Sequence, residues 1–135
     1  GVGTKLDTSA DAPYLDSAYK LVEYAGKPRF KSSEGKMTLP GRKQVFRLYE
    51  GGEMRQDVVE LEGERAEGTP LLVKVMEAGR RLRPPEDLSV IAARAREQRS
   101  LLPGYLRSLE AASPYPVVIA PALDRLRESL RTVMP

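Results

Sequence analysis

The sequence of 135 residues contains neither cysteine nor histidine. Without cysteine the chain forms no disulfide, has no thiolate nucleophile and offers no cysteine ligand to a metal. Without histidine it also lacks the most common general acid or base and the most common neutral metal ligand. Catalysis by this chain alone would have to use carboxylates, lysine, tyrosine or serine. The sequence also carries no P-loop, no cluster of metal ligands and no nucleophile–base constellation, so we expect no catalytic residue and no metal ligand within it.

Long hydrophobic runs and a strong charge of one sign are also absent. The longest uncharged stretch, from Ala111 to Leu123, is interrupted by prolines and is much shorter than the ~20 residues that cross a bilayer. The N-terminus has no signal-peptide pattern. The net charge is only +3, which permits an anionic ligand without requiring one. We therefore predict no membrane span and expect the protein in the cytoplasm.

Glycine and proline are plentiful, with 11 of each, and they divide the chain into short segments. Residues 19–31 carry an Ala-Gly pair between two short apolar runs, which predicts a β-hairpin. A second hairpin is predicted over 45–61, around the sequence "EGGE", because its arms are rich in β-branched and aromatic residues. The sequence "PLLVKVM", residues 70–76, predicts a fifth strand.

The second half of the chain predicts helices. Asp87 or Ser89 can cap a helix that runs to about Leu102 with one apolar face, and a short helix is predicted over 103–112. Residues 115–121 are predicted to be extended, and Pro121 begins a final helix with an apolar stripe and i,i+3 ion pairs. Antiparallel β-hairpins followed by C-terminal helices predict a single domain of the α+β class.

The sequence "GVGT" at the start of the chain is a candidate anion site. Glycines at Gly1 and Gly3 allow the backbone N–H groups to approach a phosphate, and Thr4 adds a hydroxyl donor. The pattern by itself also fits a flexible tail.

Two groups of cations are further candidates. Arg42, Lys43 and Arg47 could face an anion or a nucleic acid, although solvated side chains at a sheet edge are the favoured interpretation. Acidic residues interrupt a second series, which has no aromatic platform and therefore favours a solvated face. Its members are Arg80, Arg81, Arg83, Arg94, Arg96 and Arg99.

Several stretches together resemble the C-terminal part, about the last third, of the nicotinate phosphoribosyltransferase family. They are "GVGTKLDTS", "YKLVEYAGKPRFK", "SSEGKMTLPGRKQVFR" and the closing helices, in the order of the family. Asp7 departs from the family pattern, which tends to have an apolar residue there. Beyond Leu61 the likeness depends on element order. The resemblance implies the end of a type II phosphoribosyltransferase whose α/β barrel is largely missing from this chain.

The resemblance divides the chain into residues 1–18, a phosphate-binding loop at the end of the barrel, and residues 19–135, a C-terminal α+β region. It implies that Gly1, Gly3 and Thr4 bind the ribose phosphate of phosphoribosyl pyrophosphate. The family joins this substrate to nicotinate, giving nicotinate mononucleotide for NAD biosynthesis. The reaction needs Mg²⁺ and is coupled to ATP hydrolysis.

For this chain the resemblance implies a missing N-terminal barrel portion as partner and a homodimer. It implies that the chain alone binds neither Mg²⁺ nor ATP and is inactive. The alternative is a separate small basic α+β module that binds a nucleic acid or a protein. The first interpretation predicts an apolar face left exposed, and the second a closed surface with clustered Arg and Lys.

Overall fold

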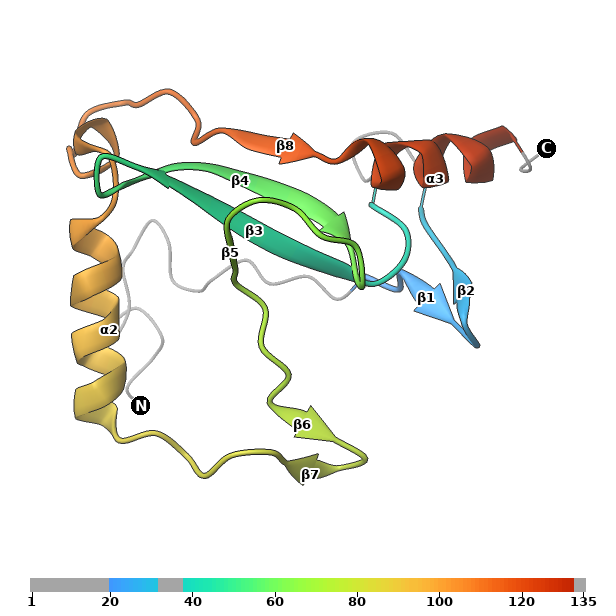
Figure 1. Cartoon of the computed structure of the whole chain (residues 1–135), viewed down its shortest axis with the longest axis horizontal. Coiled ribbons are helices and arrows are strands. Elements are labelled where there is room, and N and C mark those ends of the chain that lie inside the picture. The colour runs from blue at the N-terminus through green and yellow to red at the C-terminus, as the bar shows by residue number, and fades with distance from the viewer. Residues whose placement is uncertain (1–19, 32–37, 133–135) are drawn as a thin grey trace, which may run out of the picture.

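A computed structural model describes residues 20–31 and 38–132, arranged around one mixed sheet (Figure 1). The strand order is β5-β3-β4-β8. The four strands are β3 (Lys43–Glu50), β4 (Glu53–Leu61), β5 (Thr69–Pro70) and β8 (Val117–Ile119). The pairs β3–β4 and β3–β5 are antiparallel, whereas β4–β8 is parallel. The predicted α+β class is confirmed, with one late strand returning to the sheet beside β4.

The β3–β4 hairpin is the longest paired segment that the structure describes. Val45 lies opposite Val59 and Phe46 opposite Val58, so β-branched and aromatic side chains meet across the strands. Gly51 and Gly52 both have positive φ, 59° and 83°, which a tight two-residue hairpin connection requires. A β-bulge shifts the register between Leu48 and Tyr49.

Two smaller hairpins turn at Ala-Gly pairs. The predicted first hairpin is present as β1 (Glu23–Tyr24) and β2 (Lys27–Pro28), with positive φ at Ala25 and Gly26. A second, β6 (Met76–Glu77) with β7 (Arg80–Arg81), was not predicted. Its turn residues, Ala78 and Gly79, repeat the same dipeptide with the same positive φ.

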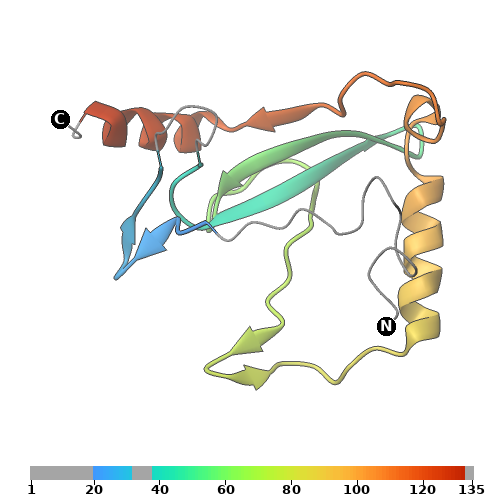
Figure 2. The ribbon, with the colours of Figure 1, turned by 180° about the vertical axis from the view of Figure 1, so that it is seen from behind.

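The predicted fifth strand over 70–76 is wrong in extent, because β5 ends at Pro70. The side-chain amide of Gln44 donates to the backbone O of Leu72 at 3.0 Å and accepts from its N–H at 2.8 Å. A side chain therefore occupies the hydrogen-bonding groups that would continue the ladder. From there the chain leaves the sheet. Residues 71–100, which we call the arch, pass through the β6–β7 hairpin and return along α2 (Leu88–Ser100), as Figures 1 and 2 show.

The helices occur in the predicted order, but the capping of the first and the length of the second differ from the prediction. Asp87 is the N-cap residue of α2, but its side chain makes no capping hydrogen bond and the helix buries none of its residues. The predicted helix over 103–112 is only one 3₁₀ turn, η1 (Gly104–Leu106). The predicted final helix is confirmed as α3 (Pro121–Thr132), with ion pairs Asp124–Arg127 and Glu128–Arg131.

Few apolar side chains are buried among the described residues, and they lie near the two ends of β4. Ala120 and Leu123, of which Leu123 has no exposed surface, lie where α3 meets the end of β4. Met54 is buried near the start of β4, where its N–H donates to the backbone O of Leu101 at 2.7 Å. Pro40 is also fully buried. No helix among the described residues is long and apolar enough to span a membrane.

Candidate functional site

The predicted phosphate-binding residues Gly1, Gly3 and Thr4 lie outside the described residues. The same holds for the whole of the predicted phosphate-binding segment, residues 1–18. Both remain predictions from the sequence.

The cations of the first basic group contact this chain itself. Their interpretation as solvated side chains is wrong for Lys43 and Arg47, which are partly buried, whereas Arg42 is exposed as that interpretation expects. Arg42 pairs with Glu23 at 2.9 Å and lies 3.8 Å from Glu62. The Lys43 ammonium donates to the backbone O of Leu39 at 2.8 Å and to that of Gly41, and burial lowers the pKa of Lys43. These contacts divide the group between separate partners. It therefore does not form one anion site.

The third member of the group, Arg47, forms a polar cluster with Asp57 and Tyr115. Its guanidinium donates to both oxygens of Asp57, at 2.8 and 2.7 Å, and the Tyr115 hydroxyl donates to Asp57 at 3.2 Å. The Arg47 guanidinium also lies 5.8 Å from the centre of the Tyr115 ring and donates to the sulfur of Met54. Asp57 is buried and the Arg47 side chain is 20% exposed.

The electrostatics of this cluster indicate a structural role. The hydrogen bond to Asp57 raises the pKa of Arg47, so the guanidinium stays charged. Burial, followed by the charge of Asp57, raises the pKa of Tyr115, so the phenol stays protonated. Neither group is positioned to exchange a proton near neutral pH. The cluster instead joins β3 and β4 to Tyr115, two residues before β8.

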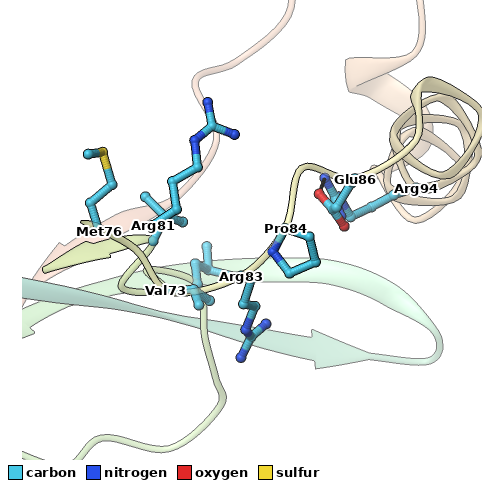
Figure 3. A pocket seen from close by; sticks show the side chains of 9 residues that line it. Val73, Met76, Arg81, Arg83, Pro84, Glu86 and Arg94 are labelled. Atoms are coloured by element: carbon cyan, nitrogen blue, oxygen red, sulfur yellow. Dashed lines mark hydrogen bonds and ion pairs between the residues drawn. The ribbon is translucent and has the colours of Figure 1, made fainter. Parts of the chain in front are cut away.

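A pocket of about 660 Å³ lies beneath the arch (Figure 3). Its lining combines three arginines of the second basic group with residues that the sequence analysis did not group with them. The apolar part is Leu71, Val73, Val75, Met76 and Pro84, and the polar part is Arg81, Arg83, Glu86 and Arg94. Arg94 holds Glu86 through two hydrogen bonds, one of 2.8 Å, and this bonding lowers the pKa of Glu86. The Arg81 and Arg83 side chains extend in opposite directions, so they do not converge on one anion.

The arginines of the second basic group are all exposed, as the interpretation of a solvated face predicts. Among the described residues, the side chains of Arg80, Arg81 and Arg83 make no ion pair or hydrogen bond. In the same part of the chain, no group of three or more acidic residues could hold a metal ion.

Comparison with known proteins relates the chain to one family. Residues 62–127 match the family model described as the nicotinate phosphoribosyltransferase C-terminal domain. This match covers the region beyond Leu61, where the resemblance in sequence depended on element order alone. It also includes the whole arch, residues 71–100.

Individual relatives extend the similarity toward the N-terminus. The nicotinate phosphoribosyltransferase pncB2 of Mycobacterium tuberculosis is 49% identical over 123 residues, covering 89% of this chain and 26% of the relative. The mouse nicotinate phosphoribosyltransferase is 30% identical over 156 aligned positions, covering 96% of this chain and 29% of the relative.

The fold leads to the same group of proteins. The crystal structure of human nicotinic acid phosphoribosyltransferase aligns with a TM-score of 0.73 at 28% identity, over 84% of this chain and 26% of that chain. The chain thus spans just over a quarter of the length of the relatives it matches. It belongs to the nicotinate phosphoribosyltransferase family and corresponds to a C-terminal part of its members.

Proposed function

We propose that this chain is the C-terminal segment of a nicotinate phosphoribosyltransferase. The whole enzyme joins nicotinate to phosphoribosyl pyrophosphate and releases nicotinate mononucleotide and pyrophosphate, in the biosynthesis of NAD and with ATP hydrolysis. The observation that carries this proposal is the 49% identity to pncB2 across 89% of the chain. The match of the fold to the human nicotinic acid phosphoribosyltransferase supports it independently.

The contribution that we propose for this segment is structural and substrate-positioning. Departure of pyrophosphate leaves positive character on the ribose, and Mg²⁺ in the whole enzyme would stabilise the leaving group. We also propose that Mg²⁺ and ATP bind in the remainder of the protein. The chain alone is then inactive, and the active form is a homodimer in the cytoplasm.

For substrate positioning we propose Gly1, Gly3 and Thr4. Backbone N–H groups at glycines and a threonine hydroxyl are fixed donors, which suit a ribose phosphate whose charge does not change during the reaction. In an active enzyme, Gly3→Val is expected to raise the KM for phosphoribosyl pyrophosphate about tenfold, since one lost contact of about 1.4 kcal/mol has this effect. The KM for nicotinate should stay unchanged.

A hybrid enzyme tests the proposed function. This chain would replace the corresponding C-terminal part of pncB2, and formation of nicotinate mononucleotide would be followed with nicotinate, phosphoribosyl pyrophosphate, Mg²⁺ and ATP. We expect activity within roughly tenfold of the parent enzyme, in line with the identity of the exchanged parts. The isolated chain, and pncB2 cut at the junction, should form no product. A soluble, folded hybrid without activity beside an active parent would contradict the proposal.

A further inference from the structure

The arch exposes apolar side chains along most of its length. They lie in the segment between β5 and β6, in β6 itself, just after β7 and at the start of α2. We call six of them the arch surface: Leu72, Val73, Val75, Met76, Leu82 and Leu88. Leu88 is 80% exposed and Val75 is 67% exposed. Three of the six, Val73, Val75 and Met76, line the same pocket, so these exposed apolar side chains gather in one place. Exposed apolar side chains that gather in this way mark an interaction site.

The arch gains little stability from its own elements. Strands β6 and β7 have two residues each and pair only with one another among the described residues. A hairpin of that size is marginal in water. Helix α2 has 13 residues and buries none of them, and a helix near this length is marginal without tertiary packing. The arch therefore needs a partner surface to hold its conformation.

The charge of the arch indicates which kind of partner surface it can contact. Basic side chains outnumber acidic ones in residues 71–100, and two of the acidic ones are already paired, Glu77 with Lys74 and Glu86 with Arg94. Arg80, Arg81 and Arg83 remain available for carboxylates outside the described residues. A second copy of the chain would bring the same excess of positive charge to a symmetric contact. A partner surface that is apolar and bordered by carboxylates fits better.

We propose that the arch surface docks onto the remainder of the nicotinate phosphoribosyltransferase polypeptide, at an apolar area bordered by Asp or Glu side chains. This inference rests on the proposed function. The family model includes the whole arch, and the relatives carry nearly three quarters of their length outside the region that this chain covers. The arch is thus a shared element of proteins that all possess a larger body for it to contact.

Amide hydrogen exchange in the hybrid with pncB2 tests this docking. Peptides from residues 71–91 should exchange at least about tenfold more slowly in the hybrid than in the isolated 135-residue chain, because docking opposes local opening. Val75→Asp and Arg81→Glu should each remove most of that protection in the hybrid. Neither should alter the far-UV circular dichroism of the isolated chain, since both side chains are exposed.

Matched controls lie outside the arch. Leu109→Asp alters another exposed leucine, and Arg65→Glu alters another exposed arginine that makes no ion pair among the described residues. Both should leave exchange of residues 71–91 unchanged. Peptides from β4 serve as the internal reference in every sample.

The docking proposal is overturned if the arch exchanges equally fast in the hybrid and in the isolated chain, or if the arch variants behave like the controls. Self-association of the isolated chain that Val75→Asp abolishes would identify a second copy as the partner and overturn it as well, as would an insoluble hybrid. A protected arch in an inactive hybrid contradicts only the proposed function. An active hybrid with an unprotected arch contradicts only the docking.

Discussion

The β3–β4–β8 part of the sheet and the arch belong to one short chain but differ in whether their side chains find partners within it. In the sheet, Asp57 receives hydrogen bonds from Arg47 and Tyr115, and α3 covers the strands with Leu123. In the arch, apolar side chains are exposed and Arg81 has no side-chain partner among the described residues. The buried polar groups of the first region find their partners within this chain, although Val117 and Val118 of β8 are exposed. The second region is suited to a neighbour.

The largest expected effect is on the polar cluster of the sheet. Asp57→Ala leaves the Arg47 guanidinium largely buried without its carboxylate, which should lower the free energy of unfolding of the 135-residue chain by about 3–5 kcal/mol. Urea unfolding measures this. Glu50→Gln, which removes the carboxylate of an exposed pair with Arg55, is the control and should cost less than about 1 kcal/mol. An equal loss of unfolding free energy in both variants would mean that the buried cluster stabilises the chain no more than an exposed ion pair does.

A matched pair of leucines compares the two regions directly. Leu123→Ala removes a fully buried side chain and should lower the free energy of unfolding by about 2–5 kcal/mol. Leu88→Ala removes one that is 80% exposed at the start of α2, and should change it by less than about 0.5 kcal/mol in the isolated chain. A large loss for Leu88→Ala would show that the arch packs on this chain itself.

A smaller, pH-dependent effect is expected at Tyr115. Tyr115→Phe removes the hydrogen bond to Asp57 and should cost about 1 kcal/mol at pH 7. The pKa of Tyr115 is raised in the folded state, so its stabilising contribution is complete below the ordinary tyrosine pKa of about 10 and is lost as pH rises through the folded value. Urea unfolding at pH 7 and above pH 10 should therefore show the difference between the two proteins shrinking. A difference that grows with pH would contradict this sign.

The smallest effect is expected at the hairpin turns. Ala25 and Ala78 have φ of 49° and 46°, in the left-handed region that glycine adopts without strain. Ala25→Gly should raise the free energy of unfolding by about 0.5 kcal/mol, the net of relieved strain and added chain entropy. Ala78→Gly lies in the arch and should leave global unfolding unchanged. Equal gains at both positions would show that the arch unfolds together with the sheet.

The sequence predicted the fold well where local signals were strong. A few neighbouring residues were enough to predict three features. They are the turn at Ala25-Gly26, the turn at Gly51-Gly52 and the amphipathic helix α3 with its apolar stripe. The same Ala-Gly signal at Ala78-Gly79 follows the predicted strand over 70–76, and no turn was predicted there. Strand β5 ended early because Gln44 reaches Leu72, a contact across 28 residues that no local pattern contains.

For the function and the candidate site, too, the sequence predicted one part and missed another. The likeness to nicotinate phosphoribosyltransferases could be recognised from short motifs, and the comparisons confirm it. The pocket beneath the arch could not be recognised, since its lining comes from the segment between β5 and β6, from β6 and β7, from the segment before α2 and from α2 itself. Apolar periodicity in α2 also predicted a face packed on this chain, although periodicity alone does not identify which surface covers a helix.

By itself, the sequence determined the family, the α+β class, the hairpin at Gly51-Gly52 and the absence of cysteine and histidine chemistry. Only the tertiary structure decided that Arg47 meets Asp57. Without the bulge between Leu48 and Tyr49, the hairpin register would place Arg47 opposite Gln56. One extra residue shifts the partner by one position, because the pairing of two strands is a property of both strands and of the side chains that they bury together.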